Sequence, residues 1–301
     1  MNQTTDHVLM VRPANFAFND ETAVNNAFQK KIDGRVGEKA LEEFDAYVSL
    51  LKHNGIKVDI LQDTPEPPTP DSVFPNNCFS THRDEDGRTT LVLYPMFAHN
   101  RRLEREKLMR WINLSDYDRV NDLTYFESKG QILEGTGSLV LDREHHIAYA
   151  CLSPRTSDSL LNTWAKQMNY DVIAFESQDE HGTLVYHTNV MMHVGTSLAV
   201  VCLDSVRNDE QRARLVNALN HSGKKIIEIS LEQMNCFAGN MLELRNTEGE
   251  KLLVMSKTAR QSLTPEQVDL IEQHLRIVAP DIHTIETVGG GSARCMIAEL
   301  F

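Results

Sequence analysis

The sequence predicts an α/β fold in which five similar units close into a propeller around one central pocket. Strand-like segments alternate with five amphipathic helical segments along the 301 residues. Small-residue turns also recur at Asn77, Glu134, His187, Asn240 and Cys295, in steps of 57, 53, 53 and 55 residues. A period near fifty residues is typical of repeat architectures in which every unit is one supersecondary element.

Each predicted unit has the order strand, strand, helix, strand. The predicted helices are 37–53, 100–113, 156–168, 208–221 and 265–276. The last of them has Thr264 as its cap and Pro265 at its first position. Each helix leads into a β-rich segment, at 58–61, 123–126, 171–175, 225–229 and 282–287, and residues 296–301 are predicted to form a final buried strand.

The terminal units favour a closed arrangement of the repeats. An open solenoid needs atypical capping repeats with a polar outer face, and neither terminal unit has that character. We therefore expect one catalytic domain over residues 1–301, with the five turns meeting at one end of the axis. Residues as distant in sequence as Asn77 and Cys295 then face each other across the pocket.

The amino-acid composition limits which classes of function are compatible with the sequence. A formal net charge of −13 disfavours tight binding to nucleic acid or to an anionic membrane. The chain lacks a long apolar run and a signal-like N-terminus, so a cytoplasmic location is expected. Five widely spaced cysteines without a CxxC pair disfavour disulfides and a structural zinc site. We expect reduced thiols, no metal and no cofactor, and the oligomeric state stays open.

Three of the recurring turns carry the residue types that covalent catalysis needs. A cysteine nucleophile requires a base or a cation to become a thiolate, and its leaving group requires a proton donor. Cys295, His187 and Glu134 supply one thiol, one imidazole and one carboxylate at equivalent positions of the repeat. We predict that they form the catalytic set of a small-molecule enzyme.

The motifs at these turns resemble those of the guanidine-modifying enzymes of pentein fold. This family includes arginine deiminases, dimethylarginine hydrolases and amidinotransferases, and the resemblance runs from about Val8 to Phe301. The matching stretches are Pro70-Asp-Ser-Val-Phe74, Glu134-Gly-Thr-Gly137, Leu152-Ser-Pro-Arg-Thr156, His187-Thr-Asn189 and Gly290-Gly-Ser-Ala-Arg-Cys295. The resemblance implies a pentein fold and a hydrolase that works through a covalent cysteine intermediate.

The same resemblance implies roles for substrate-binding residues. Arg155 is expected to grip the α-carboxylate of an amino-acid substrate through paired hydrogen bonds. Arg101 resembles the family's second carboxylate-binding arginine, and whether Arg101 or the adjacent Arg102 faces the pocket stays open. Asp71 lies in the stretch that resembles the guanidinium-binding segment of dimethylarginine hydrolases, and its carboxylate also suits the α-ammonium group. Asn76, Asn77 and Asn189 are expected to face the group that reacts.

The asparagines are also where this chain departs from its relatives. Deiminases have acidic residues at the positions of Asn77 and Asn189, and dimethylarginine hydrolases have one at the position of Asn76. Amides retain hydrogen bonding without charge, so they favour a neutral ureido group. The Val-Arg-Pro-Ala-Asn-Phe start and the Gly-Gly-Gly-Ser-Ala-Arg-Cys-Met end resemble citrulline ureidases. The best prediction is hydrolysis of citrulline to ornithine, carbon dioxide and ammonia.

Several alternatives remain at this stage. Asp71 and Glu134 could still hold a cation, which would make the protein an arginine deiminase, a dimethylarginine hydrolase or an amidinotransferase. A non-catalytic pentein that binds a partner would lack the three catalytic residue types. A papain-like peptidase would place its cysteine near the start of the mature chain, on a helix.

Overall fold

Five three-stranded sheets of identical topology make up the framework of the protein. The structure is a computed structural model and describes residues 2–301. In every sheet an antiparallel pair is followed by a parallel neighbour, and a helical connection precedes that third strand. The observed unit is therefore strand, strand, helix, strand, as predicted from the period of the turns.

Four sheets are built from consecutive strands. Their strands are β3 (Phe79–Arg83), β4 (Thr89–Leu93) and β5 (Arg119–Asp122); β6 (Val140–Asp142), β7 (Ile147–Cys151) and β8 (Asp171–Phe175); β9 (Met192–Val194), β10 (Leu198–Val201) and β11 (Lys225–Glu228); and β12 (Leu242–Arg245), β13 (Lys251–Val254) and β14 (Arg276–Val278).

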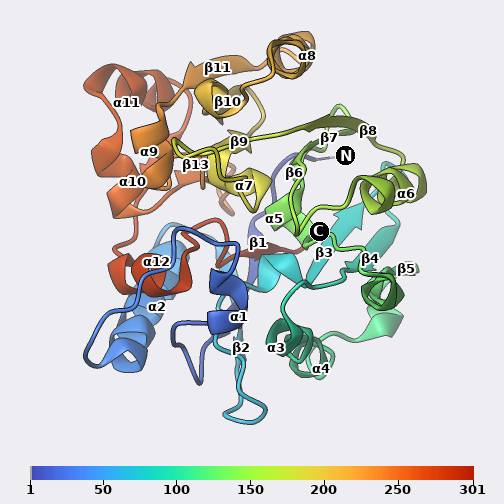
Figure 1. Cartoon of the computed structure of the whole chain (residues 1–301), viewed down its shortest axis with the longest axis vertical. Coiled ribbons are helices and arrows are strands. Elements are labelled where there is room, and N and C mark those ends of the chain that lie inside the picture. The colour runs from blue at the N-terminus through green and yellow to red at the C-terminus, as the bar shows by residue number, and fades with distance from the viewer. Residues whose placement is uncertain (1) are drawn as a thin grey trace.

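The fifth sheet joins the two ends of the chain. Strand β1 (His7–Arg12) pairs in parallel with β2 (Lys57–Gln62) and antiparallel with β15 (Ala298–Glu299). Figure 1 shows the five sheets arranged around a common central region, with the longer helices toward the outside. Because β15 follows the loop that carries Cys295, this pairing also holds the thiol in place.

The helices lie between the second and third strands or at the turns. The longer ones are α2 (Val36–His53), α6 (Asp158–Met168), α8 (Asp209–His221) and α11 (Pro265–Glu272). The short ones are α1 (Asp20–Ala23), α3 (His99–Arg102), α4 (Glu104–Leu108), α5 (Gly135–Ser138), α7 (Thr188–Met191), α9 (Leu231–Asn235), α10 (Lys257–Ser262) and α12 (His283–Gly289), with 3-10 turns η1 (Pro75–Asn77), η2 (Leu114–Asp116), η3 (Thr124–Lys129) and η4 (Leu203–Ser205).

Local sequence explains the ends of several helices. Thr264 caps α11 in a capping box with Gln267, and Pro265 is its first residue, which confirms the predicted start. The side chain of Asn208 caps α8 by accepting from the backbone N–H of Gln211. The predicted helix 100–113 is instead broken into α3 and α4, and the buried Arg101 lies where α3 ends.

Two predicted strands are wrong. Residues 123–126 lie in the 3-10 turn η3 and its cap, and the third strand of that sheet is β5, immediately before them. Residues 282–287 belong mostly to helix α12, whose first N–H groups, those of Thr284 and Ile285, donate to the carboxylate of Glu43 on α2. The third strand of that sheet is β14, which pairs with β13.

Candidate active site

The segment that carries the predicted nucleophile Cys295 (the nucleophile loop) runs from the end of α12 to β15 and packs closely against Phe74. A Cβ atom on Gly289 would lie 2.7 Å from Cζ of Phe74, and one on Gly291 would lie 3.0 Å from the same ring. These glycines therefore allow the loop to approach the aromatic ring. The loop ends at Cys295, whose side chain is 3% exposed and belongs to the apolar cluster around α2 and β1.

Two asparagine amides converge on the sulfur of Cys295. Nδ2 of Asn189 lies 3.3 Å from Sγ, and Nδ2 of Asn240 lies 3.2 Å from it. Asn189 is in α7, and Asn240 lies in the turn before β12. The predicted turns of three different units thus meet at the thiol.

Glu134 and His187 form a buried pair. They are the N-cap residues of α5 and α7, two equivalent short helices. Nε2 of His187 lies 2.7 Å from Oε2 of Glu134. The other carboxylate oxygen accepts from the backbone N–H of Phe97 at 2.8 Å, and Nη1 of Arg155 lies 3.5 Å from Oε2. Glu134 is thus held in place on both oxygens.

These contacts decide the protonation states of the pair. Burial opposes the charge on Glu134, but Arg155 and the hydrogen bond with His187 outweigh it and lower the pKa of Glu134 to about 2. Burial lowers the pKa of His187 to about 4, although Glu134 acts in the opposite direction. At neutral pH the pair is a carboxylate and a neutral imidazole. Since the carboxylate only accepts, Nε2 carries the proton and Nδ1 has the free lone pair.

Gly137 in α5 makes room for the imidazole. A Cβ atom at this position would lie 2.6 Å from Nδ1 of His187 and 2.3 Å from Nδ2 of Asn77. Any side chain here would displace both residues. The fourth residue of the Glu-Gly-Thr-Gly turn therefore has a packing reason to be glycine.

Arg155 is buried and already bound by one segment of the chain. Its Nε and Nη2 atoms both donate to Oδ1 of Asn25, at 2.8 and 2.6 Å, and Nη2 also donates to the carbonyl of Thr22. Its guanidinium lies 4.9 Å from the ring centroid of Tyr186. The forked contact with Asn25 has the geometry that a carboxylate oxygen would take.

Arg101, and not Arg102, points toward the site. Arg101 is 2% exposed and donates to both carboxylate oxygens of Glu104, at 2.9 and 3.0 Å. Its Nη1 donates to Oδ1 of Asn77 at 2.7 Å. Arg102 bonds to the backbone of its own loop. The charge of Arg101 is therefore matched inside the protein by Glu104.

Asp71 has one oxygen engaged and one without a hydrogen-bond partner among the described residues. Oδ2 accepts from Asn19 at 2.8 Å and from Thr22 at 3.0 Å, and Oδ1 has no such partner. Burial raises the pKa of Asp71, and Arg101 only partly offsets this. A buried carboxylate with an unsatisfied oxygen is a ready partner for a cationic group.

The three substrate-facing asparagines of the sequence prediction lie in different environments. Asn77 lines the small cavity next to Cys295 and is tied to Arg101, whereas Asn189 points its Nδ2 at the sulfur. Neither side-chain polar atom of Asn76 has a hydrogen-bond partner within residues 2–301, although the side chain is fully buried.

The space between these groups is too small for an amino acid. It measures about 10 Å³ and is bordered by Asp71, Asn77, Arg155, His187 and Cys295 among others. That volume corresponds to roughly one water molecule. Asn26, from the connection between β1 and α2, also borders it. An amino-acid substrate therefore requires some of the residues that border this space to change position.

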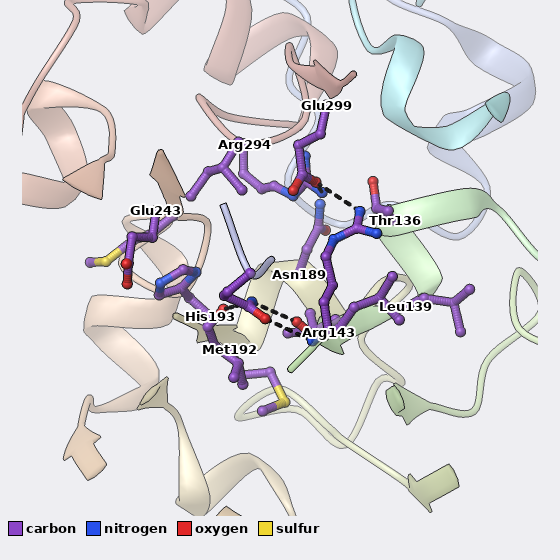
Figure 2. Close-up of a pocket in the computed structure, with 15 residues that line it drawn as sticks. Thr136, Leu139, Arg143, Asn189, Met192, His193, Glu243, Arg294 and Glu299 are labelled. Carbon is purple, nitrogen blue, oxygen red and sulfur yellow. Dashed lines mark hydrogen bonds and ion pairs between the residues drawn. The ribbon is translucent and has the colours of Figure 1, made fainter. Parts of the chain in front are cut away.

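A second, polar cavity lies on the other side of Asn189. Figure 2 shows Arg143, Arg294 and Glu299 directed toward one another within it. Glu299 lies 2.7 Å from Arg294 and 3.6 Å from Arg143. Asn189 borders this cavity and also contacts the thiol, so it separates the buried ion pairs from the nucleophile.

Two site residues were not assigned by sequence reasoning. Asn240 was recognised as a repeat turn but received no role, although its equivalence to His187 and Cys295 was an available signal. Asn25 lies in a polar connection without a motif, and nothing in the sequence pointed to its contact with Arg155.

Residues 2–301 contain no cluster of His, Cys, Asp and Glu that could hold a metal ion. Within the same range, none of the helices combines the length and the apolar character that crossing a membrane demands. The cysteines at 78, 151, 202, 236 and 295 are all free thiols.

One protein family matches nearly the whole chain. Residues 12–301 match the family model described as N,N dimethylarginine dimethylhydrolase, eukaryotic. No curated protein sequence matches the chain.

Solved structures share the fold at low sequence identity. ArgZ, described as an arginine dihydrolase from the ornithine-ammonia cycle in cyanobacteria, superposes with a TM-score of 0.76 and 17% identity over 97% of this chain, which spans 40% of that protein. An N-terminal domain of ArgZ covalently bound to a reaction intermediate gives 0.75 and 18%, covering 97% of this chain and 96% of the domain. A DDAH from Pseudomonas aeruginosa complexed with citrulline gives 0.68 and 16%, covering 99% and 100%.

Proposed function

Because this chain belongs to the N,N dimethylarginine dimethylhydrolase family of the pentein superfamily, we propose that it hydrolyses citrulline to ornithine, carbon dioxide and ammonia. The chain is a hydrolase of the type that forms a covalent cysteine intermediate. The finer assignment concerns which group the cysteine attacks, a charged guanidinium or a neutral ureido group.

The pairing of charges around the thiol carries the proposal. Glu104 matches Arg101, and Glu134 is occupied by His187, Arg155 and the backbone of Phe97. Asp71 keeps one free oxygen, which suits the α-ammonium group. Next to the sulfur stand the neutral amides of Asn189 and Asn240. Burying a guanidinium without a carboxylate partner costs several kcal/mol, so a neutral ureido group is favoured there.

The proton path follows from the protonation of His187. Nδ1 of His187 accepts the thiol proton as the sulfur of Cys295 adds to the ureido carbon. The imidazolium then donates that proton to the departing δ-nitrogen, which releases ornithine and leaves Cys295 carbamoylated. His187 next deprotonates a water molecule that attacks this thiocarbamate. Carbamate leaves, the thiol is restored, and carbamate decomposes to carbon dioxide and ammonia.

The test is a substrate panel of citrulline, arginine, dimethylarginine and agmatine, with ammonia, citrulline and ornithine measured as products. We expect citrulline to exceed arginine by at least about tenfold in kcat/KM, which needs only about 1.4 kcal/mol of differential stabilisation. Citrulline accumulating from arginine would identify a deiminase and overturn the ureido assignment. Citrulline formed from dimethylarginine would identify a dimethylarginine hydrolase.

The control for this panel is Cys295→Ala. It is expected to abolish turnover of every substrate while leaving the thermal unfolding midpoint and citrulline binding close to those of the wild type, since the side chain is only shortened by one atom. A variant that keeps a tenth of the wild-type rate would remove Cys295 from the nucleophile role.

We further propose that the five sheets are the blades of one closed propeller forming a single cytoplasmic domain that acts on a small amino acid and binds neither nucleic acid nor membrane. The repeated topology of the sheets and the meeting of turns from different units at Cys295 support the closure. The net charge of −13 supports the proposal that the protein binds neither nucleic acid nor an anionic membrane.

A further inference from the structure

We propose that Asn240 is a further catalytic residue, whose side-chain amide stabilises the thiolate of Cys295 by donating a hydrogen bond to its sulfur. The inference rests on the proposed function, because it concerns the same nucleophile. It deepens that function by assigning a role to the one repeat turn that had none.

The orientation of the Asn240 amide is determined by its partners. Oδ1 accepts from the backbone N–H of Arg294 at 3.0 Å, and a backbone N–H can only donate. Nδ2 must therefore be on the other side, where it lies 3.2 Å from Sγ of Cys295 and 2.9 Å from the carbonyl oxygen of Asn189. If the amide were flipped, Oδ1 would face the carbonyl oxygen of Asn189 and Nδ2 would face the backbone N–H of Arg294. The donor is thus aimed at the sulfur.

Asn189 is a weaker candidate for the same role. Its Nδ2 is 3.3 Å from the sulfur, but its Oδ1 has no hydrogen-bond partner among the described residues, so nothing fixes which end of its amide faces Cys295. Asn240 is fully buried and has hydrogen bonds at both ends of its amide. It is the donor whose direction the fold determines.

A thiolate at this position needs such a donor. The side chain of Cys295 is almost completely shielded from solvent, so hydrogen bonds to its sulfur have to come from protein groups. A hydrogen bond to an ionised acceptor is about twice as strong as one between neutral groups. The Asn240 amide therefore favours the thiolate over the thiol, and it does so without adding a charge that would repel or attract the substrate.

A purely structural role must be separated from this one. Asn240 also joins the turn before β12 to α7 and to the nucleophile loop, so its loss could simply misplace Cys295. The two roles differ in their dependence on pH. Thiolate stabilisation matters only where the thiol is incompletely ionised, whereas misplacement slows reaction at every pH.

The experiment measures the alkylation of Cys295 by iodoacetamide from pH 6 to pH 10, followed by mass spectrometry of the peptide that contains it. We expect Asn240→Ala to react about tenfold more slowly than the wild type at pH 7, and within twofold of it at pH 10. Equal rates at pH 7, or an equal loss at both pH values, would overturn the proposal. Circular dichroism at each pH verifies folding.

A second variant keeps the test informative if Asn240→Ala does not fold. Asn240→Asp has the same shape and keeps the acceptor for Arg294, but it replaces the donor with an oxygen facing the sulfur. It is expected to slow alkylation at pH 7 more than tenfold, and an unchanged rate would contradict the proposal. The matched control is Asn246→Ala, which removes a buried asparagine from the β12–β13 turn that does not contact the thiol, and wild-type alkylation is expected.

Alkylation also separates this inference from the substrate assignment. The reagent tests the thiol of Cys295 without any substrate, so the Asn240 result holds whether or not citrulline is turned over. If citrulline is the substrate, kcat of Asn240→Ala at pH 7 is expected to fall in parallel with the alkylation rate.

Discussion

At the scale of single residues, Arg155 is the best test of how the substrate is held. Its Nε and Nη2 atoms make a forked contact with one oxygen of Asn25, the kind of contact that a carboxylate forms with a guanidinium. A lysine supplies charge without this planar fork. The proposed recognition of an α-carboxylate by Arg155 thus depends on the shape of the guanidinium as well as on its charge.

Arg155→Lys is expected to raise KM for citrulline at least about tenfold, because a bidentate pair becomes a single hydrogen bond. The decarboxylated analogue of citrulline serves as the control and is expected to be turned over at similar rates by both proteins. Steady-state kinetics with the two substrates decides the matter. An unchanged KM for citrulline would remove Arg155 from the carboxylate site.

His187 gives a pH prediction, because the proposed mechanism uses its neutral form as the base. With a pKa of about 4, its imidazole is neutral in the free enzyme at pH 5 to 7 and becomes protonated only in more acidic solution. We expect the protonation of His187 to leave kcat/KM for citrulline unchanged down to about pH 5. Below that pH, log kcat/KM is expected to fall by one unit for each unit of pH. An acid limb centred near pH 6.5, measured with folded enzyme, would contradict the assignment.

At the scale of elements, the connection between β1 and α2 covers the site. Asn19 and Thr22 bond to Asp71, and Thr22 and Asn25 bond to Arg155. Asn26 bonds to the carbonyl of Gly290 in the nucleophile loop. One segment thus hydrogen-bonds to both side chains proposed to bind the substrate's α-amino and α-carboxylate groups, and it occupies Arg155 and one of the two oxygens of Asp71. A substrate must replace these bonds.

Asn25→Ala removes the side chain that competes with the substrate carboxylate for Nε and Nη2 of Arg155. A typical hydrogen bond contributes about 1 kcal/mol, so KM for citrulline is expected to fall about fivefold. Lys31→Ala is the control on the same connection, because it breaks an exposed ion pair with Asp20 and a cation–π contact with Phe18 but no bond to Arg155 or Asp71, and it is expected to leave KM unchanged. An increase in KM for Asn25→Ala would mean that Asn25 contacts the bound substrate instead.

At the scale of the whole molecule, the fifth sheet connects the beginning of the chain to its end. Glu299 in β15 pairs with Arg294 in the nucleophile loop and with Arg143 beyond β6, and these side chains are buried. Its carboxylate therefore links two sheets behind the active site. Removing one partner of a buried ion pair leaves an uncompensated charge.

Glu299→Ala is expected to lower the free energy of unfolding by about 3–5 kcal/mol, because two buried guanidinium groups lose a carboxylate. Urea unfolding measures the change. Asp281→Ala, which breaks an exposed pair with Lys257, is the control, with an expected loss below about 1 kcal/mol. A loss of similar size in both variants would show that the buried network contributes no more than a surface pair.

Local sequence predicted what local interactions control. The cap and first turn of α11 depend on Thr264, Pro265 and Gln267, all within four residues, and they were predicted correctly. Helix α12 was mistaken for a strand because its β-branched residues favour one, while the groups that cap it come from Glu43, more than two hundred residues away. Strand β5 was displaced by four residues because its register depends on pairing with β4.

The sequence by itself determined the repeat, the five turns and the three candidate catalytic residues, because a period of about fifty residues and the chemistry of Cys, His and Glu can be read without coordinates. Tertiary structure alone decided which amide donates toward the sulfur of Cys295 and which segment hydrogen-bonds to Arg155. Asn240 meets Cys295 across 55 residues and Asn25 meets Arg155 across 130. Hydrogen bonds over such separations depend on how the units pack together, and no local pattern encodes their direction.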